Sequence, residues 1–78
     1  MDNNDYLIRL SSKLSGRERE VLHWMKQGKT NWEAAEILNI SENTIKYHLK
    51  NIKAKLNASN KHHAVAIAVQ AERETGRD

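Results

Sequence analysis

The sequence predicts an all-α fold, a four-helix bundle that contains a helix-turn-helix. Three observations lead to this prediction. The chain of 78 residues has no Pro, no Phe and only three Gly, whereas Ala, Leu, Glu and Lys, which favour helices over strands, are frequent. Apolar residues recur at the period of a helix. Capping signals precede each periodic segment in turn. A chain of this length makes one small domain with a single modest core.

The first twelve residues are polar apart from an apolar cluster at Tyr6, Leu7, Ile8 and Leu10. Two interpretations stay open: a tail or linker, and a short extra turn packed on the domain. We expect the tail or linker over residues 1–12, because chain ends order only when something holds them. The domain is then expected over residues 13–75, with a second tail at residues 76–78.

The first helix is predicted from the capping box of Ser15 and Glu18 to about Gln27, where Gly28 stops it. Val21, Leu22 and Met25 form its core-facing stripe, and we expect Trp24, beside the stripe, to be at least partly buried.

The second helix opens with a capping box of Thr30 and Glu33 and is short. Asn39 stands where the chain must turn sharply, and Asn tolerates the left-handed conformation best among residues other than Gly. Ser41 then caps the next helix, with Ile40 placed to pack against Ile45.

The third helix, over residues 42–57, has two faces of different chemistry. Ile45, Leu49, Ile52 and Leu56 form a narrow apolar stripe, and the opposite face carries Asn43, Lys46, Tyr47, Lys50, Lys53 and Asn57. Such side chains can reach both phosphates and base edges in a DNA major groove. A solvated basic face would give the same periodicity. The preceding short helix and tight turn favour the first interpretation, because together the two helices make a helix-turn-helix.

The charge distribution supports nucleic-acid binding. Residues 41–61 hold five Lys and one Glu, a charge of +4, whereas the rest of the chain holds eight basic and nine acidic residues, a charge of −1. The excess positive charge therefore lies on the third helix and the turn after it, as expected for a nucleic-acid binder.

The fourth helix is expected over residues 60–74, starting at Ser59 or Asn60. Its segment from Ala64 to Val69 is apolar without a break. Ala64, Val65 and Ala68 are spaced to complete the core, which leaves Ile67, Val69 and Ala66 facing outward. A helix that is apolar all round indicates a partner surface in so small a domain. The alternative is that this helix is simply more deeply packed.

Several classes of protein are disfavoured. The chain has no Cys, so it forms no disulfide or thiolate metal site, which suits a reducing cytoplasm. His62 and His63 are adjacent and point about 100° apart on a helix, so they cannot hold one ion together. His23 and His48 lack partners at ligand spacing. We find no nucleophile–base pair, glycine-rich phosphate loop, signal peptide or membrane-length apolar run. We therefore expect no enzyme activity, cofactor, metal or membrane partner.

Four segments carry a family resemblance: LSGREREVL (14–22), GKTNWEAAEILNIS (28–41), TIKYHLKNIKAKLN (44–57) and NKHHAVAIA (60–68). They resemble the LuxR-type (GerE- or FixJ-type) DNA-binding domains of bacterial transcription regulators. VLHWMKQGK and GKTNWE look most like the quorum-sensing branch, attached to acyl-homoserine-lactone sensors. Two departures are minor: Gly16 stands where the family often has Pro or a polar residue, and Ala34 where Ile is usual.

The resemblance implies a helix-turn-helix without a wing. It implies sequence-specific binding of double-stranded DNA by the output domain of a regulator that acts in the bacterial cytoplasm, at the nucleoid. The helix at 42–57 would enter the major groove, and the helix at 60–74 would join two copies on an inverted-repeat operator. RNA polymerase would be a further partner, and His48 would be structural.

Helical phase and the family motif together select the expected site residues. The expected base contacts are Asn43, Lys46, Tyr47 and Lys50. The expected DNA-backbone contacts are Thr30, Asn31, Trp32, Thr44, Asn51, Lys53 and Lys55. The expected dimer interface is Ala66, Ile67, Val69 and Gln70. Two alternatives stay open: Lys46 and Lys50 as phosphate contacts, since Lys is less selective than Arg for guanine, and Glu42 as a cap of its own helix. We expect Trp32 to pack partly between helices as well as to contact the backbone.

Two rival functions fit parts of the sequence. A sigma-factor promoter-recognition domain has a similar helix-turn-helix pattern but ends soon after the recognition helix, whereas this chain continues into an apolar helix. A helical protein-interaction module would use the same four helices, but the basic face argues against it. A start at Met1 with no sensor fits either a single-domain regulator or an excised fragment.

Overall fold

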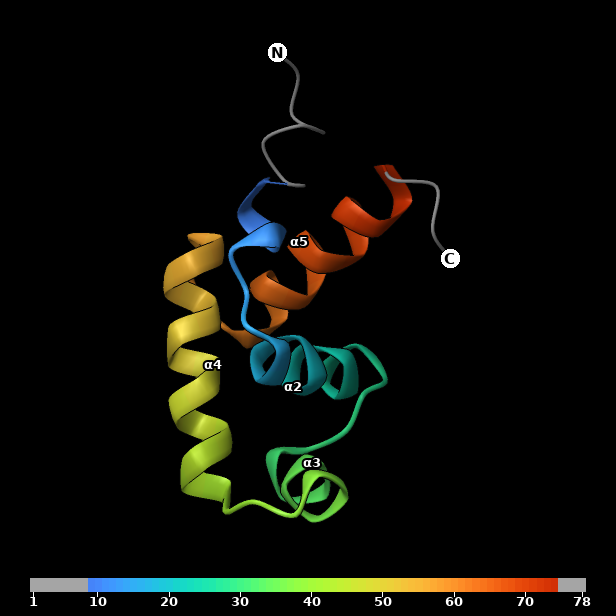
Figure 1. Cartoon of the computed structure of the whole chain (residues 1–78). Coiled ribbons are helices and arrows are strands. Elements are labelled where there is room, and N and C mark those ends of the chain that lie inside the picture. The colour runs from blue at the N-terminus through green and yellow to red at the C-terminus, as the bar shows by residue number, and fades with distance from the viewer. Residues whose placement is uncertain (1–8, 75–78) are drawn as a thin grey trace.

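The structure, a computed structural model, describes residues 9–74 of the chain. These residues form helices and loops, and no strand occurs among them. A single helical turn over residues 9–12 is followed by α2 (Gly16–Lys26), α3 (Asn31–Leu38), α4 (Glu42–Leu56) and α5 (Lys61–Glu74) (Figure 1). The predicted all-α class is thereby confirmed. The tail predicted at residues 76–78 lies outside the described residues, as do Tyr6, Leu7 and Ile8 of the apolar cluster.

Reciprocal capping boxes start the first two of these helices, as predicted. The Ser15 hydroxyl accepts the Glu18 backbone N–H at 3.2 Å, and the Glu18 carboxylate accepts the Ser15 N–H at 2.9 Å. The same exchange joins Thr30 and Glu33 at 3.0 and 2.8 Å. Each box satisfies two backbone donors that a helix start would otherwise leave unpaired, so it fixes where α2 and α3 begin.

A three-residue turn connects α3 to α4 and makes the helix-turn-helix. Asn39 ends α3 in the left-handed region, at φ 57° and ψ 46°, as its position predicted. Ser41 caps α4 by accepting the Thr44 N–H at 3.0 Å. A second Asn in the left-handed region, Asn57 at φ 56°, ends α4. Both turns therefore use Asn where the backbone conformation disfavours most side chains.

The core lies where α4 packs against α2, α3 and α5. In Figure 1, α4 runs along one side of the molecule and the other helices lie to one side of it. The predicted apolar stripe of α4 is buried along its whole length, and Ile45, Ile52 and Leu56 have no exposed surface. Each such side chain stabilises the fold by about 1.5–3 kcal/mol on burial. The opposite face of α4 is consequently held outward along its length.

The helical turn before α2 belongs to the domain. Leu10 and Leu14 are both buried and join the main hydrophobic cluster. Of the two interpretations left open for residues 1–12, the extra packed turn therefore holds for residues 9–12, and our expectation of a tail does not. Burial of the apolar Leu10 side chain stabilises this turn against the domain, whereas a linker has no such contact to hold it.

Alanines form the inner face of α5. Ala64, Ala68 and Ala71 are buried, whereas Ala66 is exposed. Ile67, which we expected to face outward, is only half-exposed and packs against the core cluster. The small inner residues let the helix approach the core closely, so the longer side chain beside them reaches it too. No helix in the described part of the chain is long and apolar enough to cross a membrane.

Candidate nucleic-acid interface

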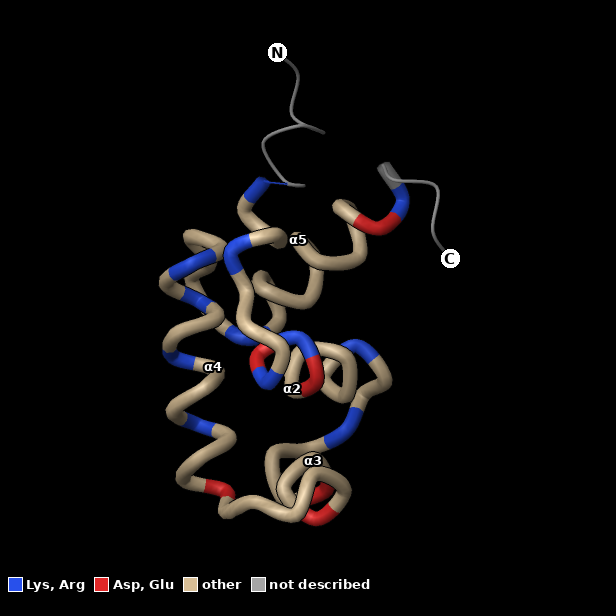
Figure 2. The backbone as a smooth tube through the Cα atoms, viewed as in Figure 1, with Lys and Arg blue, Asp and Glu red and all other residues tan. Residues whose placement is uncertain are grey.

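The outward face of α4 carries a strip of polar and basic side chains. Asn43, Lys46, Tyr47 and Lys50, the four expected base contacts, are all exposed, Tyr47 by 62%. At 100° per residue they fall within about a quarter to a third of the helix circumference. Figure 2 shows basic residues spaced along the length of α4, and Glu42 lies in the first turn of this helix. The structure therefore brings these four side chains together on one accessible surface, which we call the α4 strip.

The start of α4 is built from hydroxyls and one acidic residue. Ser41 is the N-cap, and its hydroxyl lies 2.9 Å from that of Thr44. Glu42 lies in the first turn, where a negative charge is favoured by the helix dipole. The capping atom itself comes from Ser41 rather than Glu42. Thr44, Asn51 and Lys53 are half-buried at the margins of the α4 strip.

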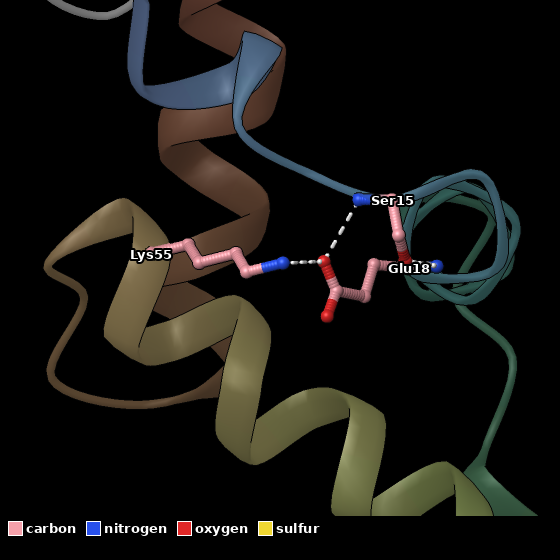
Figure 3. Close-up of polar contacts among 3 residues, drawn as sticks. All are labelled: Ser15, Glu18 and Lys55. Carbon is pink, nitrogen blue, oxygen red and sulfur yellow. Dashed lines mark hydrogen bonds and ion pairs between the residues drawn. The ribbon is translucent and has the colours of Figure 1, made fainter.

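Lys55 points elsewhere. Its ammonium donates to Glu18 Oε1 at 2.7 Å, and the same oxygen accepts the Ser15 backbone N–H (Figure 3). Lys55 lies about 140° around α4 from Lys50, on the side that faces α2. The structure therefore does not bring Lys55 to the α4 strip. Its expected role as a DNA-backbone contact stays a prediction, with a competing partner inside the protein.

Glu18 is the one charged residue among the described residues with a buried side chain, and it is 5% exposed. Burial opposes ionisation of its carboxyl, but hydrogen bonds from Lys55 and the Ser15 backbone outweigh burial and hold its pKa below the ordinary value. An ionised Glu18 can therefore connect the start of α2 to the last turn of α4.

A long-range hydrogen bond joins the start of α3 to the start of α5. Asn31 Oδ1 accepts a hydrogen bond from Lys61 Nζ at 3.3 Å. The adjacent Thr30 engages Glu33, and the backbone hydrogen bond from Thr30 lowers the pKa of the Glu33 carboxyl. Lys61 was not among the residues we expected at the site. No local signal marks it, because its partner is 30 residues away in the sequence.

Trp32 does not pack between helices as we expected, and 59% of it is exposed. Ala34 and Ala35 turn inward on α3, and Trp32 lies about 110° around the helix from their midpoint, at the flank of the buried side. Ile37 of the same helix is also exposed, by 46%. The packing role of Trp32 is therefore wrong, whereas its expected contact with the DNA backbone stays a prediction.

The expected dimer residues lie on the outer half of α5. Ala66 and Gln70, four residues apart and hence on one face, are exposed. Ile67 and Val69 flank them and are half-buried. The outer face of α5 is therefore a small apolar and polar surface rather than a broad apolar one.

Three of the four histidines have structural neighbours. His63 Nδ1 accepts the Ser59 N–H, and Asn60 Oδ1 accepts the His63 N–H, both at 2.9 Å, so these residues cap α5. The His23 ring lies edge-on to Trp24, and the His48 ring edge-on to Tyr47. Within residues 9–74 no three His, Cys, Asp or Glu side chains are grouped so that they could hold a metal ion.

Comparison with known proteins gives concordant matches. The family model for bacterial regulatory proteins of the luxR family matches residues 12–68. The transcriptional activator protein BjaR1 of Bradyrhizobium diazoefficiens is 48% identical over 60 residues, which are 77% of this chain and 25% of that protein. The HTH-type quorum-sensing regulator RhlR of Pseudomonas aeruginosa is 53% identical over 55 residues, 70% of this chain and 23% of that protein.

A solved structure agrees in fold. SdiA in complex with octanoyl-rac-glycerol aligns with a TM-score of 0.74 at 44% identity, covering 80% of this chain and 25% of that one. The regulatory protein SdiA of Escherichia coli is 46% identical over 59 residues, 76% of this chain and 25% of that protein. The chain thus spans about a quarter of the length of the relatives it matches.

Proposed function

The chain belongs to the luxR family of bacterial regulatory proteins and is a helix-turn-helix DNA-binding domain of that family, and we propose that it binds operator DNA through the α4 strip. The single observation that carries this proposal is the exposure of Asn43, Lys46, Tyr47 and Lys50 together on the helix after the turn. The family match also favours this function over a sigma-factor domain or a protein-interaction module. The proposed role is binding, with no catalysis.

In the proposed complex, α4 lies in the major groove with the α4 strip against the base edges. Lysines accept no hydrogen bonds and can donate to guanine O6 and N7, while Asn43 can pair with adenine. The Tyr47 phenol adds a donor and acceptor beside them. The charge of +4 over residues 41–61 attracts DNA before any base is read.

The DNA backbone is proposed to contact side chains from both helices of the motif. Thr30, Asn31 and Trp32 present polar and aromatic groups at the start of α3, where the backbone N–H groups and the helix dipole favour a phosphate. Thr44, Asn51 and Lys53 lie beside the α4 strip, which supports a proposed contact of each with the phosphates that border the groove. Lys55 would contribute only by leaving Glu18.

We further propose that two copies meet through α5. Ala66, Ile67, Val69 and Gln70 supply the surface, and its small size favours weak dimerisation, well below a standard interface of about 1,600 Å². A two-fold pair would place two α4 helices on half-sites about one DNA turn apart, so the operator would be an inverted repeat.

The wider setting follows from the relatives. RhlR is named a quorum-sensing regulator and BjaR1 a transcriptional activator, so we propose that this domain serves as the output domain of a quorum-sensing regulator. It would act in the cytoplasm at the nucleoid, where its DNA lies, with RNA polymerase as a further partner. The boundaries of the domain within a longer protein stay a prediction.

The decisive experiment measures DNA binding as a function of salt. Fluorescence anisotropy with a labelled random-sequence duplex should give an affinity that falls linearly with the logarithm of the salt concentration, with a slope of about 0.9 for each phosphate contact. A variant that combines Lys46→Gln and Lys50→Gln should bind more weakly while its circular dichroism stays unchanged. Binding that does not depend on salt would contradict the proposal.

A further inference from the structure

Lys61 is the first residue of α5, the helix otherwise assigned to the dimer contact, yet its side chain reaches the start of α3. Its ammonium donates to Asn31 Oδ1 at 3.3 Å, across 30 residues of sequence. The side chain is half-buried, so it is held against the protein rather than extended into water. Two segments that lie far apart in the chain thus present a cation and an amide at one place.

The charge of Lys61 is not balanced within the described residues. The ion pairs of residues 9–74 engage Arg17, Lys26 and Lys55 with carboxylates, and Lys61 takes part in none of them. Its acceptor is a neutral amide, at a distance longer than the 2.7–2.9 Å or so of a charge-assisted hydrogen bond. Two of the three ammonium protons are therefore available to another acceptor.

The two helix starts that Lys61 connects favour a bound anion. The first turn of a helix carries a positive partial charge and favours anions, and the first turn of α5 contains no acidic residue. Lys61 begins that turn, and its ammonium extends to the first residue of α3, so it adds a positive charge between two helix starts. Glu33 in the first turn of α3 supplies one negative charge, and its carboxylate accepts the Thr30 N–H. The Lys61 ammonium and the two helix starts would together attract a further anion.

We propose that Lys61 is a further DNA-backbone contact, which binds the same phosphate group as Asn31. The inference rests on the proposed function, because Asn31 is expected at the DNA backbone. Lys61 Nζ lies within hydrogen-bond reach of the Asn31 amide, so a phosphate at that amide also lies within reach of the ammonium. With this contact, α5 would have two roles. It would join the two copies, and it would fix the position of its own copy on the DNA strand.

The test removes the charge and keeps the hydrogen bond. In the full chain, Lys61→Gln can still donate to Asn31, and Lys13→Gln is the matched control, since Lys13 is an exposed lysine in the turn before α2. On a random-sequence duplex of about 20 base pairs, Lys61→Gln should lower the salt slope by about 0.9 for each bound copy. Lys13→Gln should leave the slope unchanged, and Lys61→Arg should restore it. Urea denaturation should give equal free energies of unfolding for the wild type and Lys61→Gln.

Asn31→Ala tests whether Lys61 contacts a DNA phosphate or only links α5 to α3 within the protein. It removes an uncharged partner, so the affinity should fall while the salt slope is retained. A Lys61→Gln slope equal to that of the wild type would overturn the inference, whether or not the variant is less stable. A wild-type chain that does not bind the duplex would overturn the proposed function and, with it, the assignment of Lys61 as a DNA-backbone contact. Salt-dependent wild-type binding with an unchanged Lys61→Gln slope would overturn the assignment of Lys61 alone.

Discussion

Glu18 and Lys55 connect the start of α2 to the last turn of α4. One carboxylate oxygen accepts both the Lys55 ammonium at 2.7 Å and the Ser15 backbone N–H at 2.9 Å. The carboxylate side chain is 6% exposed and the lysine side chain 37% exposed. This contact therefore fixes the angle of α4 against α2 from inside the protein, at the end of α4 farthest from the turn.

Lys55 and Lys53 should behave differently although they are two residues apart. Lys55→Ala leaves a buried carboxylate with fewer donors, so we expect the free energy of unfolding to fall by about 1–3 kcal/mol. Lys53→Ala should change stability by less than about 0.5 kcal/mol and reduce the DNA salt slope by about one phosphate contact. Urea denaturation and anisotropy measure the two effects. Equal stability of the two variants would mean that the contact with Glu18 is not formed in solution.

The pH dependence of stability should include a contribution from Glu18. The folded protein lowers the pKa of this carboxyl below its ordinary value of 4.5. The contribution to stability is therefore fully present above that value and is lost as the pH falls through the lower pKa of the folded state. We expect Glu18→Gln to flatten the decline of the free energy of unfolding below pH 4.5. The control is Glu36→Gln, at an exposed position on α3. If the free energies of unfolding of Glu18→Gln and the wild type decline in parallel as the pH falls, this contribution is excluded.

Lys50 lies at the centre of the α4 strip and should read a base. We expect Lys50→Ala to weaken operator binding by about 1–3 kcal/mol and to reduce discrimination against a scrambled duplex. Lys53→Ala is the comparison, because loss of a phosphate contact should weaken both duplexes alike. An equal loss on both duplexes for Lys50→Ala would make Lys50 a phosphate contact.

Ala66 offers a test of assembly that spares the monomer core, because it is exposed on α5. Ala66→Glu would place like charges near each other across a two-fold axis, where they repel. We expect cooperative binding to a full inverted repeat to be lost, while binding to one half-site changes little. Ala66→Gln, of similar size and uncharged, is the control. Retained cooperativity in Ala66→Glu would mean that the copies meet elsewhere.

The cap of α5 should tolerate Gln in place of His. Asn60 Oδ1 accepts the His63 N–H, and His63 Nδ1 accepts the Ser59 N–H, one residue before the donor of a capping box. Gln at the third position can accept the N-cap N–H instead. We expect Asn60→Ala to lower the free energy of unfolding by about 0.5–2 kcal/mol and His63→Gln to be nearly neutral. Thermal denaturation followed by circular dichroism compares the two. If His63→Gln lowers the free energy of unfolding as much as Asn60→Ala does, the imidazole contributes more than a cap.

Local signals in the sequence predicted most of the fold. Glu three residues after Ser15 and Thr30 marked two helix starts, because a capping box forms within one turn and needs no distant partner. Asn39 marked the turn for the same reason, since tolerance of the left-handed backbone conformation depends on the residue itself and not on a distant partner. The period of the apolar residues in α4 predicted the buried stripe and, by exclusion, the exposed strip.

The remaining features depend on distances between helices. Lys55 was grouped with the outward cations, although its helical phase places it about 140° from Lys50, against about 60° for Lys53, and phase was the signal that could have separated them. Its partner Glu18 is 37 residues away, which no local pattern encodes. Leu10 and Ile67 were misjudged for a related reason. How deeply an apolar side chain lies depends on how closely the neighbouring helices approach.

The two tryptophans give the protein a pair of built-in optical reporters. Trp24 packs against the core, so its emission should shift to longer wavelength only when the domain unfolds. Trp32 is largely exposed at the start of α3, so its emission in the folded protein should already lie at long wavelength and should change when the DNA backbone contacts it. Replacing either tryptophan with Phe would leave a chain whose fluorescence follows one event alone, without any attached dye.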